Sequence, residues 1–222
     1  MILTAPKGGR MNHGDFPVLT RSRRVSPRVL TILKRIDTII VRRTKATEAL
    51  LTEIQETELA ALPQVAEEVC GPNHPELVKV LHLLAVFYHS LYNLGKAESL
   101  YRNALACAER AFPEPNLEFG LILNNLGRLL HEQKKLPEAE ELYRQSLLVL
   151  QKAVGPGHPK LGTPMSNLAD VYMELGELEH SKALRQDLIA MLENAFGPNH
   201  RRVVKAKQKL SLLMQLDSWS SR

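Results

Sequence analysis

A proline–histidine motif that recurs at a fixed interval is the feature that most constrains the fold of this chain. The motif GPNHP begins at residue 71, returns as GPGHP at residue 155 and as GPNH at residue 197, so the starts lie 84 and 42 residues apart. A further copy is due at residue 113, where the chain has the proline-rich variant PEPN. The sequence therefore repeats every 42 residues, and such a period predicts stacked, repeated structural units.

In two adjacent columns of the aligned repeats, a large apolar residue is followed by a small one. The small residue lets a neighbouring helix approach closely, and the leucine fills the space between the two helices. In register, the pairs are Leu84–Ala85, Leu126–Gly127, Leu168–Ala169 and Leu210–Ser211.

Each unit is predicted to be a hairpin of two helices. The pairs Tyr101–Ala104 and Tyr143–Ser146 mark a second helix in which apolar residues recur at helical spacing. Short turns containing Gly or Pro separate the two helices, at residues 93–95, 134–137 and 175–177. At the joint between units, Gly ends one helix, Asn73 or His74 caps the next, and proline takes its first position.

These residues resemble a known family. Leu81, Leu84, Ala85 and Tyr88 follow the pattern L-x-x-L-A-x-x-Y of the first helix of a tetratricopeptide repeat. The 42-residue spacing, the GPxHP joint, NNLG at 124–127 and AEELY at 139–143 are similar to the kinesin light chain type of this repeat. The resemblance covers residues 71–216 and implies an all-α, right-handed α-solenoid of helical hairpins that serves as a protein–protein interaction scaffold.

The third and fourth units depart from the pattern. Arg185 replaces the aromatic residue of the second helix and Leu188 replaces the small residue, so this hairpin is expected to pack differently on the next helix. The fourth unit has only a first helix, about 201–216, which we interpret as a solvating cap. The predicted organisation is an irregular basic arm at 1–27, an amphipathic segment at 28–70, repeats at 71–112, 113–154 and 155–196, and a capping helix and tail at 197–222.

The net charge of +5 comes from the start of the chain. Residues 1–47 carry 11 Lys and Arg against 2 acidic residues, residues 48–70 carry 0 against 6, and residues 71–222 carry 18 against 16. A nucleic-acid partner is therefore expected only through residues 1–47, by attraction to phosphates. No apolar run is long enough to span a membrane.

Three interpretations compete for the segment before the repeats, where Val29, Leu33, Ile36 and Ile40 begin an apolar stripe. In the first interpretation the segment forms a coiled coil, as in kinesin light chains, although Arg43 interrupts the seam. In the second it forms a degenerate first hairpin, which we favour because 29–70 is again 42 residues. In the third the start of the chain is a mitochondrial presequence.

The two cysteines, without CxxC spacing, favour a reducing compartment, so we expect a cytoplasmic protein, with mitochondria as the alternative.

No catalytic constellation or cofactor motif is present: the chain has no HExxH, GxSxG or Walker loop. The histidines of the GPxH joints recur once per stacked unit, too far apart to share a metal ion. We therefore predict no enzyme activity, no cofactor and no metal.

A concave groove lined by the first helices is the predicted binding site. Asn125 and Asn167 are equivalent and could bond an extended peptide backbone, and cations outnumber Asp170, which favours an acidic partner. The kinesin light chain resemblance implies the same mode, in which Asn and basic residues hold short acidic peptides. The alternative is that the convex face binds and the Asn residues satisfy neighbouring hairpins. By the family register the groove residues are Lys79, His82, Leu83, Val86, His89, Asn124, Asn125, Arg128, His131, Ser166, Asn167, Asp170, Met173, Lys205, Gln208 and Lys209.

Two functions are predicted. The first is a non-enzymatic adaptor that captures an acidic, extended segment of a partner protein in the groove. The second is a structural subunit of a large protein or ribonucleoprotein assembly, anchored by the basic arm.

Overall fold

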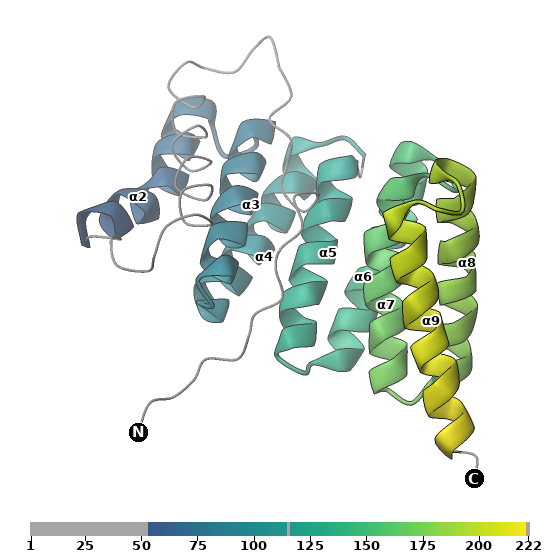
Figure 1. The fold of residues 1–222 in the computed structure, drawn as a ribbon. Coiled ribbons are helices and arrows are strands. Elements are labelled where there is room, and N and C mark those ends of the chain that lie inside the picture. Colours follow the sequence, from purple (N-terminus) through teal and green to yellow (C-terminus); the bar gives the residue numbers. More distant parts are fainter. Residues whose placement is uncertain (1–52, 115, 221–222) are drawn as a thin grey trace, which may run out of the picture.

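The computed structural model describes residues 53–114 and 116–220, and within them every regular element is helical (Figure 1). This confirms the all-α solenoid of helical hairpins. In chain order the elements are α2 (Glu53–Cys70), α3 (Pro75–Ser90), α4 (Leu94–Ala111), α5 (Leu117–Glu132), α6 (Leu136–Val154), a single 3₁₀ turn η2 (Pro159–Leu161), α7 (Gly162–Glu174), α8 (Leu178–Phe196) and α9 (Arg201–Ser220).

The helices form hairpins that stack along one direction. α3 packs on α4, α5 on α6 and α7 on α8, and α9 closes the array against α8. Figure 1 shows this succession from α2 at one end to α9 at the other. The first helices α3, α5 and α7 also contact one another directly, which brings residues from successive units onto one surface.

Histidine caps the helix that follows each GPxH joint. Nδ1 of His74 accepts from the backbone N–H of Glu76 at 3.2 Å, while Asn73 instead accepts from Nε of Arg110 at 2.9 Å. Of the two capping candidates in the sequence, the structure therefore selects histidine. The caps of His158 and His200 are equivalent, at 3.1 and 3.2 Å. The preceding glycine has a positive φ each time, 93° at Gly71, 88° at Gly155 and 83° at Gly197, which only glycine adopts without strain.

The small-residue column does what the sequence predicts. A Cβ atom built on Gly127 would lie 3.0 Å from the ring of Tyr143, which is fully buried. The leucines of the adjacent column, Leu84 and Leu126, are 1% exposed. The close approach of first and second helices is therefore set by these residues.

The third hairpin differs as its sequence suggested. Arg185 takes the place of Tyr101 and Tyr143 and is only 3% exposed. Leu188 belongs to a second core cluster, with Met191, Leu192 and Val203, that is separate from the main core running from Ala66 to Tyr172. The capping helix packs on this second cluster. Its exposed surface is basic at the start, but Leu212 and Met214 are 61% and 56% exposed, so the cap is not polar throughout.

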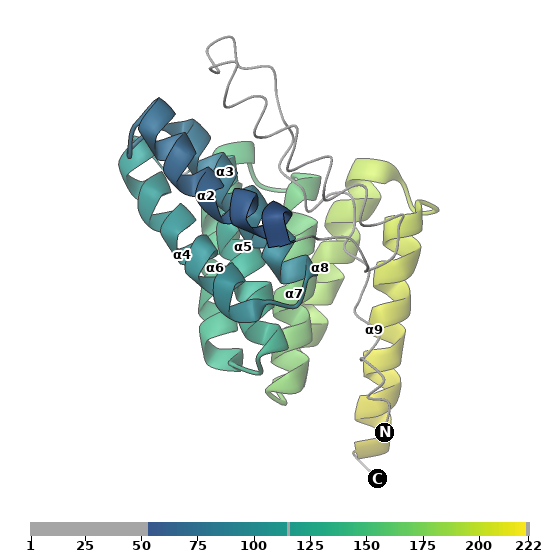
Figure 2. The same cartoon turned by 90° about the vertical axis from the view of Figure 1, so that its left-hand side faces the viewer.

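α2 continues through Pro63 and ends at Cys70, the last residue of the predicted amphipathic segment. It packs on α3 at the start of the array (Figure 2). The basic arm, the presequence interpretation and residues 28–52 of the amphipathic segment lie outside the described residues, so the coiled-coil and degenerate-hairpin interpretations of 28–70 both stay predictions. None of the described helices has the length and apolarity that crossing a membrane would require.

Candidate partner-binding groove

Successive first helices are joined by side-chain pairs that lie 43 residues apart. One period of the repeat plus one residue separates the partners, because neighbouring first helices present adjacent positions to each other. Three pairs form one column: Asn125 Nδ2 and His82 Nε2 at 2.9 Å, Asn167 Nδ2 and Asn124 Oδ1 at 3.0 Å, and Lys209 Nζ and Ser166 Oγ at 3.4 Å.

These contacts extend into one continuous hydrogen-bond chain across α3, α5 and α7. His82 Nδ1 lies 2.6 Å from Glu118 Oε1, and Nε2 of the same ring accepts from Asn125. The neutral tautomer with its proton on Nδ1 satisfies both partners. Asn124 donates to Asn125 Oδ1 at 3.2 Å and accepts from Asn167, which completes the chain.

A second column pairs histidine with glutamate. His89 Nε2 lies 3.0 Å from Glu132 Oε2, and His131 Nε2 lies 3.0 Å from Glu174 Oε1, again 43 residues apart. Arg128 adds a contact at 3.4 Å to His89 Nδ1.

The two glutamates of this column are held in the ionised form. Burial opposes ionisation of Glu132, but the His89 hydrogen bond and the charge of Arg128 outweigh it and lower its pKa. The hydrogen bond from Lys134 lowers the pKa of Glu174, against a smaller effect of burial and with further help from His131.

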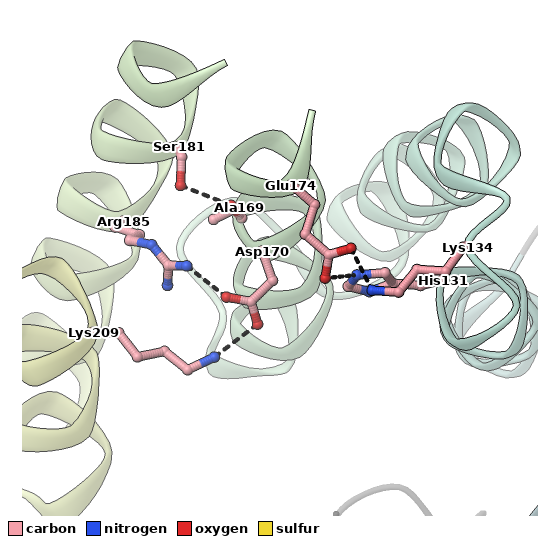
Figure 3. Close-up of polar contacts among 8 residues, drawn as sticks. All are labelled: His131, Lys134, Ala169, Asp170, Glu174, Ser181, Arg185 and Lys209. Atoms are coloured by element: carbon pink, nitrogen blue, oxygen red, sulfur yellow. Dashed lines mark hydrogen bonds and ion pairs between the residues drawn. The ribbon is translucent and has the colours of Figure 1, made fainter. Parts of the chain in front are cut away.

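A carboxylate bridges the last three helices (Figure 3). Asp170 of α7 accepts from Arg185 NH2 of α8 at 2.5 Å and from Lys209 Nζ of α9 at 2.7 Å. Ser181 of α8 donates to the carbonyl of Ala169 at 2.7 Å. In the third unit the ion pair of Arg185 with Asp170 therefore stands where the first two units have a buried tyrosine.

The structure buries part of the predicted groove. Six residues that the sequence analysis assigned to the groove are buried: His82 at 0%, Leu83 and Val86 at 1%, Asn125 at 2%, His89 at 3% and Asn124 at 4% exposure. Half-buried are Lys79, Arg128, His131, Ser166, Asn167, Asp170, Met173 and Lys209, while Lys205 and Gln208 are exposed.

Acidic residues pair with most of the groove cations, and two of them, Glu76 and Glu132, were not singled out in the sequence analysis. Lys79 bonds Glu76 at 3.1 Å, Arg128 Nε lies 3.9 Å from Glu132, and Lys209 is held by Asp170. Two of these pairings, three and four residues apart within one helix, follow from helical spacing, whereas the Lys209–Asp170 pair joins two helices at a separation of 39 residues. Among the described residues, no three His, Cys, Asp or Glu side chains gather as a metal site would require.

The comparisons agree with this architecture. Family models described as tetratricopeptide repeat match residues 78–116 and 118–194, which together make up just over half of the chain. A comparison with curated proteins found no match.

Solved structures of the same fold include the nearly identical repeats of a candidate kinesin light chain from Podosopora anserina. One structure of these repeats has a TM-score of 0.70 at 16% identity over 95% of this chain and 90% of the other. BtubC (BKLC) from P. vanneervenii has a TM-score of 0.64 at 21% identity over 76% of this chain and 68% of the other. The chain therefore belongs to the tetratricopeptide repeat family, with a fold of the kinesin light chain-like type.

Proposed function

We propose that this protein is a non-enzymatic adaptor that holds an acidic, extended segment of a partner protein at the α7–α9 end of its groove. Tetratricopeptide repeats are protein–protein interaction scaffolds, and stacked hairpins present an extended concave surface suited to a peptide.

The observation that carries the proposal is the contrast between the two ends of the groove. On α3 and α5, His82, His89, Asn124 and Asn125 are buried and bonded to neighbouring side chains. On α7 and α9, Asn167 and Ser166 each have a hydrogen bond within the array but are only half-buried, and Gln208 is exposed. Polar groups that water can reach can also bond a peptide backbone, whereas fully buried ones cannot.

The distribution of charged residues also favours the α7–α9 end of the groove. Residues 201–209 contain five Lys and Arg and no acidic residue. Lys207 pairs with Glu193 and Lys209 with Asp170, but Lys205 forms no ion pair with any described residue. An exposed, unpaired cation next to amide donors favours a carboxylate-bearing segment and speeds its association.

The test measures binding of fluorescent peptides that alternate Leu with Glu, against matched peptides that alternate Leu with Gln. Fluorescence anisotropy of the full chain should show tighter binding of the acidic peptide, and the preference should shrink at high salt. Lys205→Glu should weaken acidic-peptide binding about tenfold, which corresponds to about 1.4 kcal/mol.

Lys152→Glu is the matched control, because Lys152 is exposed on α6, a second helix outside the groove. It should leave the affinity for the acidic peptide unchanged. Equal effects of the two substitutions, or equal binding of the acidic and neutral peptides, would contradict the proposal.

A further inference from the structure

The α3 face that points toward the start of the chain is apolar, unlike the same face of α5. Asn125 and Arg128 of α5 point back toward α3 and contact His82 and His89 there. One period earlier, the equivalent positions are Leu83 and Val86, and each is 1% exposed. These two side chains therefore face a further layer that precedes α3 in the stack.

The described part of that layer is the second helix of a hairpin. α4 spans Leu94–Ala111, and subtracting one period of 42 residues places its counterpart at 52–69. α2 spans Glu53–Cys70, within one residue of this position, and packs on α3. The counterpart of α3 in the sequence is then the segment 33–48.

We infer that residues 33–48 dock on the Leu83–Val86 face of α3 as the first helix of a degenerate repeat, with Ile40 against Leu83. The 43-residue rule that pairs His82 with Asn125, Asn124 with Asn167 and Ser166 with Lys209 assigns Ile40 to Leu83. In the second column the same rule assigns Thr47 to Ser90. Both pairs match in polarity, apolar with apolar and hydroxyl with hydroxyl.

Glu76 gives independent support. Its counterpart Glu118 is bonded by His82, but the residue equivalent to His82 is Ile40, which has no hydrogen-bond donor in its side chain. Glu76 is 4% exposed, and its Oε2 has no hydrogen-bond partner among the described residues. A neighbour without a donor leaves this oxygen unpaired, as observed.

Charge complementarity favours a hairpin within one chain over a coiled coil between chains. Residues 28–47 contain six Lys and Arg and one Asp, while residues 48–70 contain six Glu and no cation. Two helices of opposite charge attract each other in a hairpin, whereas a parallel pair of the basic segment would bring like charges together. The docked segment would add a hairpin to the array, so the basic segment becomes part of the scaffold.

The test uses the full chain and introduces the polar His82–Asn125 pair of the next layer at the equivalent positions, 40 and 83. Ile40→His and Leu83→Asn each place a polar group in an apolar contact and should lower Tm by about 4–8 °C. The double variant recreates the His82–Asn125 pair, with Glu76 as the carboxylate that accepts from the new histidine. It should recover at least half of the combined loss. The control combines Leu83→Asn with Ile39→His, one residue out of register, and should recover nothing.

Three results would overturn the inference: losses that simply add in the Ile40→His, Leu83→Asn double variant, the same recovery with Ile39→His, or a recovery that depends on protein concentration. The last result would assign the occupant of the face to a second copy of the chain.

A labelling experiment decides the matter if a polar variant fails to fold. Leu83→Cys in a Cys70→Ser background should react slowly with a maleimide, and adding Ile40→Ala should speed its reaction at least tenfold. Adding Val18→Ala, outside 28–70, should not. Cys107, which is 2% exposed, reports in the same molecule that the array stays folded. An unchanged rate with Ile40→Ala would contradict the inference.

Discussion

His131 of α5 and Glu174 of α7 lie 3.0 Å apart, Nε2 to Oε1, and the same contact joins His89 and Glu132 one unit earlier. The contact recurs because each first helix meets the next with the same geometry. The interface between units thus repeats the same residue pairs, and each pair can be tested separately by mutation.

Ionised Glu174 should stabilise the array in a pH-dependent manner. Its pKa in the folded state lies below the ordinary value of a Glu side chain, about 4.3. Its contribution is therefore present above that pH and is lost as the pH falls through the lowered pKa. Glu174→Gln should lower the free energy of unfolding at pH 7, and its curve should converge with that of the parent below about pH 4, measured by urea denaturation.

Glu109→Gln is the control for the pH experiment, because Glu109 is exposed on α4. It should run parallel to the parent curve. A constant gap between the Glu174→Gln and parent curves down to pH 3 would show that the charge of Glu174 does not stabilise the fold.

Asn125→Ala should destabilise the protein by about 1–3 kcal/mol, because Asn125 is 2% exposed and its loss leaves buried partners unpaired. Chemical denaturation of the full chain measures the change. Asn194→Ala, exposed on α8, should cost less than about 0.5 kcal/mol. If Asn125→Ala leaves stability intact, the hydrogen-bond chain through His82 contributes nothing to the fold.

Tyr143→Phe should leave the protein as stable or raise its stability by up to about 1 kcal/mol. Tyr143 is fully buried, and its hydroxyl has no hydrogen-bond partner among the described residues. The same burial raises the pKa of Tyr143 far above its ordinary value. Tyr101→Phe is the matched comparison, because the Tyr101 hydroxyl lies 3.4 Å from His89 Nδ1. A larger loss of Tm for Tyr143→Phe than for Tyr101→Phe would refute this expectation.

Gly176→Ala should cost about 1 kcal/mol, because the turn between α7 and α8 holds Gly176 at a φ of 82°. No atom lies within 4 Å of the added Cβ, so the cost is that of the backbone alone. Gly95→Ala also adds a methyl group in open space, but at a position without positive φ. It should be neutral or slightly stabilising, and equal thermal shifts for the two variants would rule out backbone strain as the cause.

Much of the fold could be predicted from the sequence because its signals are local and repeated. The GPxH joints, the Leu–small columns and the turn residues each act within one unit, and the structure places helices where these patterns indicate them. α2 ends at Cys70, the last residue of the 29–70 segment that the repeat period marks out in the sequence.

The exposure of the residues in the proposed groove could be predicted only in part. The register places Asn125, Asn167 and Lys209 on successive first helices, but it does not show that each of them bonds a residue of the preceding unit. Exposure depends on what the next unit places opposite a residue, and that partner lies 43 positions away.

The sequence by itself determined the unit of this protein: a 42-residue helical hairpin, its caps and the small residues that let its helices meet. The tertiary structure decided which polar groups remain available. Stacking encloses His82, Asn124 and Asn125 between neighbours and leaves Lys205 and Gln208 open to water. The physical reason is that helix formation and capping depend on residues close in sequence, whereas burial and charge pairing depend on surfaces that meet only when the units stack.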